Sequence, residues 1–172
     1  VEPLCAARLR DGFVRECHGD LHLANLVRTD RGVRAFDCLE FNADLRWIDT
    51  LSDVAFLVMD TAVRGRTDLA YAFLDGYLDA TGDYEGARLL RFYVSYRTLV
   101  RAKVAALRLE GLADDDPERA ACEARFARHL AQAEHLERRG PGTLVLMCGL
   151  SGSGKSWLAE RLAPQLGALR LR

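Results

Sequence analysis

The feature that most constrains this chain is a glycine-rich loop at residues 149–156, near the C-terminal end of the sequence. The loop reads GLSGSGKS and satisfies the pattern G-x-x-x-x-G-K-[ST]. An apolar run, TLVLMC at 143–148, precedes it, and SWLAERLAPQLG at 156–167 follows it. The sequence therefore predicts a strand, a loop and a helix in succession, the context in which this pattern holds a phosphate.

The residues of this loop suit a nucleotide. Glycines allow backbone conformations that aim several N–H groups at one phosphate, and the next helix presents its positive end. Lys155 can reach the β- and γ-phosphates, and the Ser156 hydroxyl can ligate Mg²⁺. We expect ATP to be held by Gly149, Leu150, Ser151, Gly152, Ser153, Gly154, Lys155 and Ser156. The simpler alternative is a flexible turn rich in Gly and Ser.

Little chain follows the loop. Residues 157–172 offer one helix and the start of one strand, and a single βα unit cannot cover both faces of a parallel strand. We therefore expect residues 140–172 to be a linker, GPG, and the first β-loop-α unit of a truncated P-loop α/β domain. The segment LVLMCGLSGSGKSWLAERLA resembles the start of small P-loop kinases and AAA-type ATP-binding domains.

A second informative stretch, CHGDLHLANLVRTDRGVRAFDCLEF, occupies residues 17–41. Residues 25–28 and 33–37 are predicted to be strands joined by a hairpin turn at TDRG. Such a hairpin brings Asn25 and Asp37 together at its mouth, where their oxygen atoms suit Mg²⁺. Asp20 lies five residues before Asn25 on the loop leading into the first strand. It can face the same space and act as a general base.

This stretch resembles the catalytic segment of the aminoglycoside phosphotransferase and choline kinase-like family, which shares the protein-kinase fold. The resemblance rests on H-G-D-x-x-x-x-N followed by a strand ending in Asp. It implies that Asp20 accepts the proton of a substrate hydroxyl, that Asn25 and Asp37 hold Mg²⁺, and that His18 is a structural member of the loop. It further implies that Asp53, in WIDTLSDVAFL, braces the catalytic loop from the next helix.

Each of these residues also has an interpretation without catalysis. Asp20 and Asn25 can be turn residues, and Asp37 can simply end a strand. Thr50 and Asp53 have the spacing of a capping box, so Asp53 can instead mark a helix start. For Arg97 and Arg101, in YRTLVRAK, we expect a solvated or salt-bridged helix face, with pairing to site carboxylates as the alternative.

Most of the remaining sequence has helical periodicity, with apolar residues at helical spacing over 50–63, 68–80, 84–110 and 115–139. Pro after Asp116 indicates a helix start at that point. We expect an α+β, mostly helical fold, in which residues 1–139 form a kinase-like C-terminal lobe with a catalytic β-hairpin. The N-terminal lobe of that family, with its phosphate-covering loop and strand Lys, is absent from these residues. Exposed apolar surface is expected at both edges.

Composition excludes several other classes. Apolar residues make up 49% and charged residues 28%, which fits a globular chain, and a net charge of −1 does not favour nucleic-acid binding. No signal peptide opens the chain, and no apolar run approaches the roughly 20 residues of a membrane span. The five scattered cysteines fit buried free thiols in a reducing compartment. We expect a cytoplasmic protein with no membrane or nucleic-acid partner.

Three hypotheses follow for a chain that resembles the middle of a two-domain protein. The first is an enzyme that transfers the γ-phosphoryl group of Mg·ATP to a small-molecule hydroxyl, with a second ATP site at the P-loop. The second is a nucleotide-binding regulatory module without transferase activity. The third is a non-catalytic helical remnant. The sequence does not identify the acceptor.

Overall fold

The computed structural model describes residues 1–137 and 143–171, and the chain is α+β and mostly helical, as the sequence predicts. The α-helices are α1 (Glu2–Arg10), α2 (Thr50–Val63), α3 (Thr67–Thr81), α4 (Leu90–Glu110), α5 (Arg119–Glu137) and α6 (Lys155–Leu166). The short 3₁₀ helices are η1 (Leu23–Asn25), η2 (Ala43–Leu45) and η3 (Gly86–Leu89). The strands are β1 (Val14–Glu16), β2 (Leu26–Thr29), β3 (Gly32–Ala35) and β4 (Trp47–Asp49). They form two antiparallel pairs, β1 with β4 and β2 with β3.

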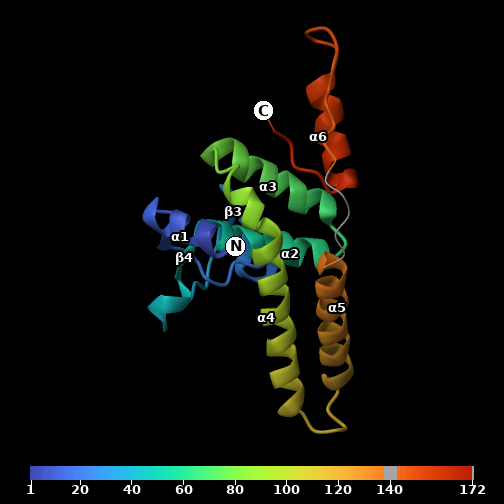
Figure 1. Cartoon of the computed structure of the whole chain (residues 1–172). Coiled ribbons are helices and arrows are strands. Elements are labelled where there is room, and N and C mark those ends of the chain that lie inside the picture. The colour runs from blue at the N-terminus through green and yellow to red at the C-terminus, as the bar shows by residue number, and fades with distance from the viewer. Residues whose placement is uncertain (138–142, 172) are drawn as a thin grey trace.

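Helix α2 lies at the centre of the molecule, with α3 and α4 packed across it (Figure 1). Every residue from Leu51 to Thr61 is buried. Most of these side chains are apolar, and a helix that is apolar on all sides is stable only inside a core. The largest fully buried side chains are Phe56, Leu51, Met59, Leu74, Leu78, Leu89, Thr98 and Cys122.

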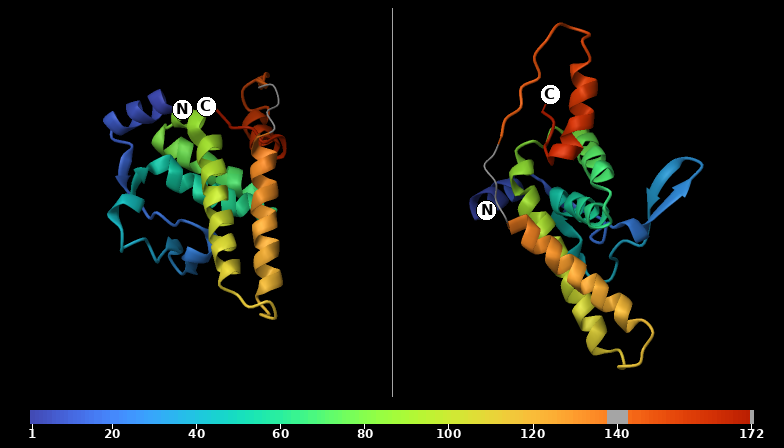
Figure 2. Two further views of the ribbon diagram at one scale, coloured as in Figure 1. Left: turned by 60° about the horizontal axis from the view of Figure 1, so that its bottom comes forward. Right: turned by 90° about the vertical axis from the view of Figure 1, so that its right-hand side faces the viewer.

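Helices α4 and α5 lie side by side as a long helical hairpin that extends away from the central core (Figures 1 and 2). Small side chains allow the two helices to approach closely. The Cys122 thiol on α5 donates a hydrogen bond of 3.3 Å to the carbonyl oxygen of Ala105 on α4. The buried alanines of this pair are Ala102, Ala105 and Ala133.

A buried charged cluster fixes α1 to the core. The Arg8 guanidinium, 3% exposed, donates four hydrogen bonds of 2.6 to 2.8 Å to the carboxylates of Asp49 and Asp83. The hydroxyl of Tyr77 donates to Asp83 at 2.9 Å and that of Tyr93 to Asp49 at 3.1 Å. This cluster ties α1 to the residue that precedes α2 and to the turn that follows α3, because each charge is paired and hydrogen-bonded.

Two predicted boundaries are wrong. Residues 143–148 form no strand; no described strand lies beside them, and a lone strand leaves its backbone groups unpaired. The last long helix begins at Arg119, two residues after Pro117, and the Asp116 carboxylate accepts the N–H of Glu118 at 2.8 Å just before it. The GPG segment predicted to be a linker lies outside the described residues.

The C-terminal segment packs on α3. Arg170 forms an ion pair with Asp75, and residues of α3, α6 and the segment that follows α6 line a pocket of about 410 Å³. The expectation of buried thiols is only partly met: Cys122 is buried, Cys148 is exposed and the other three are half-buried.

Apolar side chains are exposed at many positions of the described chain, including Leu99 and Val104 on α4, so the exposure is not confined to the two edges where it was expected. Phe41, near β4, is 81% exposed, and Leu150, in the glycine-rich loop, is 84% exposed. Others of this kind are Val33, Phe36, Trp47, Leu144, Leu146 and Trp157. Among the helices of the described residues, none combines the length and the apolar character needed to cross a bilayer.

Candidate active site

The segment at residues 18–25, which we call the catalytic loop after the role that its resemblance implies, is held in place by α2. The Asp53 carboxylate, on the first turns of this helix, accepts the backbone N–H of His18 at 2.9 Å and that of Gly19 at 3.1 Å. The predicted bracing contact is therefore confirmed. The capping-box interpretation of Asp53 is wrong, because the Asp49 carboxylate accepts an N–H of the first helical turn instead.

A second carboxylate of α2 extends this support. Asp60 is buried and accepts the backbone N–H of Leu23 at 2.9 Å. It lies seven residues after Asp53, about two helical turns, so both carboxylates face the loop from one side of the helix. Sequence reasoning missed Asp60, although this spacing of two acidic residues within an apolar helix was visible as a signal.

Arg97 of α4 also supports the backbone of the catalytic loop. Its guanidinium is 7% exposed and donates to the carbonyl oxygens of Ser52 at 3.2 Å and Gly19 at 3.3 Å. It also lies 4.9 Å from the centre of the Phe56 ring. Burial lowers the pKa of Arg97, against the opposing charge of Asp53. The prediction of a solvated or salt-bridged face is therefore wrong for Arg97, which is a buried structural cation.

Asp20 presents its carboxylate at the surface of this loop, with 32% of the side chain exposed. His22 lies beside it, with 3.2 Å between Nε2 and a carboxylate oxygen. Nδ1 of His22 accepts the N–H of Ala24, so the neutral ring carries its proton on Nε2 and donates it to Asp20. This hydrogen bond outweighs burial and lowers the pKa of Asp20. The carboxylate is therefore ionised at neutral pH.

Asn25 joins the catalytic loop to the hairpin. Its amide nitrogen donates to the backbone carbonyl of Asp20 at 3.0 Å and approaches the Asp20 carboxylate at 3.4 Å and the carbonyl of Asp37 at 3.5 Å. The prediction that a hairpin brings Asn25 and Asp37 together is confirmed. The predicted strand start is wrong by one residue, because Asn25 closes η1 and β2 begins at Leu26.

Asp37 follows the hairpin in an unusual backbone conformation. Strand β3 ends at Ala35 rather than at Asp37, although Phe36 still donates its N–H to the carbonyl of Asn25 at 3.0 Å. Asp37 has φ 59°, a left-handed conformation uncommon outside glycine and found at functional sites. His18 contacts the carbonyl of Phe36 at 2.8 Å through Nε2, which agrees with the structural role predicted for it.

Oxygen atoms of Asn25 and Asp37 suit magnesium. Because the amide nitrogen of Asn25 contacts the loop, its oxygen is the atom left for a cation. The exposed Asp37 carboxylate makes no hydrogen bond or ion pair with any described residue. No cluster of three or more His, Cys, Asp or Glu suited to a metal occurs among residues 1–137 and 143–171. Magnesium would thus rely on two side chains, nucleotide phosphates and water, as it commonly does.

Three glycines of the glycine-rich loop adopt left-handed backbone conformations, which agrees with the conformational freedom that the sequence assigns to them. Helix α6 begins at Lys155, so Ser156 lies in its first turn. The Lys155 ammonium donates to the carbonyl oxygens of Gly149 at 2.9 Å and Leu150 at 2.6 Å, and so folds over the loop. Positive φ angles, which glycine adopts without strain, occur at Gly149, Gly152 and Gly154.

The two predicted sites lie in different parts of the molecule. Figures 1 and 2 show the loop before α6 at one end of the chain's long dimension, away from the β2–β3 hairpin, which projects from the core. The structure therefore brings together His18, Asp20, Asn25, Asp37 and Asp53, and it keeps the residues of the glycine-rich loop apart from them. The two sites cannot share one nucleotide within this arrangement.

Similar proteins are known from mycobacteria. Two proteins described as uncharacterized, from Mycobacterium tuberculosis and Mycobacterium bovis, are each 39% identical to this chain over 167 residues, which cover 97% of it. The chain spans only 32% of the length of these relatives. No protein-family model and no solved structure matches the chain.

Proposed function

We propose that this chain supplies the catalytic lobe of a Mg·ATP-dependent phosphotransferase, which transfers the γ-phosphoryl group of ATP to the hydroxyl of a small molecule. The proposal rests on one observation, the convergence of Asp20, Asn25 and Asp37 where the catalytic loop meets the hairpin. Phosphoryl transfer asks for little more than positioning and charge stabilisation, which such a constellation can provide.

The reaction assigns a separate task to each residue. The acceptor oxygen bonds to the γ-phosphorus as the bond to the β–γ bridging oxygen breaks, and ADP leaves. The acceptor proton passes to the Asp20 carboxylate, which is ionised and oriented by His22. Asn25 and Asp37 would hold Mg²⁺, which would neutralise charge on the phosphates. Asp53 and Arg97 are positioning residues, since they act through the backbone of the catalytic loop.

The rigid support beneath the catalytic loop favours catalysis over an ordinary turn. Three buried charged side chains, Asp53, Asp60 and Arg97, make hydrogen bonds to the backbone of residues that surround Asp20. Burying charge is costly unless each group is well paired, and a surface turn needs no such support. Preorganisation of a catalytic group is a reason to retain it.

The resemblance to the aminoglycoside phosphotransferase and choline kinase-like family agrees with this assignment. We propose residues 1–139 as its kinase-like C-terminal lobe and residues 140–172 as a linker and the first unit of a P-loop domain, of the kind that small kinases and AAA-type ATPases contain. In this account ATP binds a second time at residues 149–156, with Lys155 on its phosphates and Ser156 on its Mg²⁺. The greater length of the mycobacterial relatives leaves room for an ATP-covering lobe.

The test is Asp20→Asn in the full-length protein, with transfer of labelled γ-phosphate to a panel of hydroxyl compounds as the readout. The variant should lose at least about a hundredfold in turnover, the lower range for removing a general base. Asp30→Asn is the matched control, because Asp30 is an exposed carboxylate in the hairpin turn. Equal turnover of Asp20→Asn and the parent would remove Asp20 from the mechanism.

Measurements on the unsubstituted protein distinguish the phosphotransferase from the alternative, a regulatory nucleotide-binding module. If full-length protein binds ATP and Lys155→Ala abolishes that binding, while no compound is phosphorylated, the chain is a nucleotide-binding module. Two features of the glycine-rich loop favour this alternative: the Lys155 ammonium is hydrogen-bonded to the loop, and its glycines have left-handed φ angles. Measurable transfer by the parent would exclude this alternative.

A further inference from the structure

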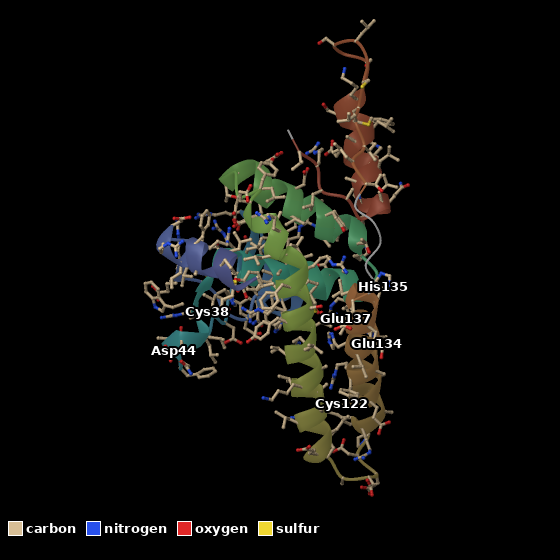
Figure 3. The ribbon with its side chains drawn as sticks, viewed as in Figure 1. Cys38, Asp44, Cys122, Glu134, His135 and Glu137 are labelled. Carbon is tan, nitrogen blue, oxygen red and sulfur yellow. The ribbon has the colours of Figure 1, made fainter. Side chains whose placement is uncertain are left out.

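A pocket of about 170 Å³ lies between α4 and α5, outside the residues assigned to catalysis. Four of the side chains that line it are basic, namely Arg101, Arg108, Arg125 and His129, and the others are Val104, Ala105 and Cys122. No carboxylate lines it. Figure 3 labels Cys122 at this contact between the two helices. The pocket is therefore a small cleft with a positive wall and an apolar floor.

Two of these arginines have no partner. Arg101, on α4, and Arg125, on α5, make no hydrogen bond or ion pair with any residue that the structure describes. Arg108, by contrast, forms an ion pair of 2.8 Å with Glu118, which does not itself line the pocket. Like charges on facing helices repel one another unless an anion lies between them. The arrangement favours a bound anion, which Arg recognises with two parallel hydrogen bonds.

His129 adds an independent sign of a missing partner. It is 7% exposed, and its buried Nδ1 has no hydrogen-bond partner among the described residues. Burial, with the charge of Arg101, lowers the pKa of His129. The imidazole is therefore neutral at pH 7 and can donate one N–H to a ligand without adding to the repulsion.

Arg101 connects this pocket to the catalytic loop. It follows Arg97 by four residues, about 6 Å along the same face of α4. Arg97 contacts Gly19 of the catalytic loop. The charge of Arg101 also acts on Asp20, where it contributes, after the His22 hydrogen bond, to the lowered pKa. The pocket therefore begins one turn of α4 beyond the residue that contacts the catalytic loop.

We propose that this pocket holds an anionic group, a phosphate or a carboxylate, of the molecule whose hydroxyl is phosphorylated at Asp20. The proposal rests on the proposed function and names its acceptor class as a hydroxylated anion. A polycationic acceptor, such as an aminoglycoside, is repelled by Arg101 and Arg125, which have no carboxylate partner among the described residues. The acceptor hydroxyl gives its oxygen to the γ-phosphorus and its proton to Asp20, while the anionic group stays unchanged in the pocket.

The first experiment measures binding without requiring transfer. Full-length protein carrying Lys155→Ala, which removes the P-loop as a phosphate site, is titrated by calorimetry with inorganic phosphate and, separately, with acetate. Adding Arg101→Gln and Arg125→Gln should weaken binding at least about tenfold, as expected for losing charge-assisted hydrogen bonds. Lys103→Gln with Arg128→Gln is the matched control, because both are exposed basic residues on the same helices outside the pocket.

The control should bind as tightly as the parent, and circular dichroism should match in all variants. Tighter binding of phosphate than of acetate would indicate that the acceptor carries a phosphate group. Tighter binding of acetate than of phosphate would indicate a hydroxy acid. No measurable binding of either anion, or equal binding by the pocket variant and its control, would overturn the proposal.

The second experiment links the pocket to transfer. Sugar phosphates, hydroxy acids, neutral sugars and an aminoglycoside are offered to the full-length protein with Mg·ATP. Anionic acceptors should be preferred, and Arg101→Gln with Arg125→Gln should raise KM at least tenfold with little change in kcat. If neutral or cationic acceptors are phosphorylated and the two substitutions do not change the kinetics, the acceptor assignment is overturned while the proposed function remains intact. Anion binding without transfer to any acceptor would instead overturn both.

Discussion

The catalytic loop and the glycine-rich loop hold their shapes in different ways. Residues 18–25 depend on side chains from distant parts of the chain, since Asp53, Asp60 and Arg97 make hydrogen bonds to the backbone around Asp20. Residues 149–156 depend on their own glycines and on Lys155, which bonds two carbonyls of the same loop. The first is a tertiary site and the second a local one, so damage to the core should affect them unequally.

The largest expected effect comes from breaking the charged cluster beneath α1. Arg8→Met leaves Asp49 and Asp83 buried without their cation, and breaking a buried ion pair costs about 3–5 kcal/mol. Urea denaturation of the full-length protein should show this loss for the unit that contains the catalytic loop. Arg10→Met is the control, since Arg10 is exposed on the same helix. Equal stability of the two variants would mean that the cluster does not support the core.

The next effect is specific to the catalytic loop. Asp53→Ala removes the acceptor of two backbone N–H groups, a loss of about 1–3 kcal/mol in the free energy of unfolding, and should lower transfer by displacing Asp20. ATP binding at Lys155 should not change. A variant that loses nucleotide binding at the P-loop as well would show that the two sites are not independent.

Acid should destabilise the core through Asp83. Burial acts to raise the pKa of Asp83, but hydrogen bonds from Arg8 and Tyr77 outweigh it and the pKa is lowered. A carboxylate whose pKa is lower when folded stabilises the protein above its unfolded pKa of about 3.9, and loses that contribution as pH falls further. Asp83→Asn should therefore be less stable than the parent at pH 7, with the difference shrinking below about pH 4. A difference independent of pH in thermal unfolding would contradict this linkage.

The smallest effect on stability is expected at the glycine-rich loop. Lys155→Ala removes hydrogen bonds that are exposed to solvent, so the free energy of unfolding should change by no more than about 0.5 kcal/mol. ATP affinity at this site should fall steeply, because the ammonium is the cation placed for the phosphates. Arg161→Ala, an exposed cation on α6, serves as the control. A large loss of stability would show that this loop is not self-contained.

The same contrast explains what the sequence could predict. Helices 50–63 and 68–80 follow from periodicity, and the hairpin with Asn25 and Asp37 at its mouth follows from a turn of two residues. The roles of Asp60 and Arg97 depend on the side of α2 and α4 that faces the catalytic loop, which local patterns do not specify. The strand predicted at 143–148 failed for the opposite reason, since apolar β-rich sequence forms a strand only beside a partner.

The pocket between α4 and α5 is harder to predict from the sequence than the roles of single residues. Arg101 and Arg125 come from two helices, and only the packing of α4 on α5 brings their charges to one cleft. The sequence led to an expectation of a solvated or ion-paired face for Arg101, and the structure adds a cleft in front of it. The pattern of basic residues within each single helix does not predict the cleft that forms between the two helices.

The most direct test of this account compares Asp20→Asn with Lys155→Ala in the full-length protein, with phosphoryl transfer to an acceptor and ATP binding measured on both. Asp20→Asn should lose at least about a hundredfold in transfer and retain ATP binding at the P-loop. Lys155→Ala should retain transfer and lose that binding. Transfer that survives Asp20→Asn and disappears with Lys155→Ala would contradict the account, because the chemistry would then occur at residues 149–156.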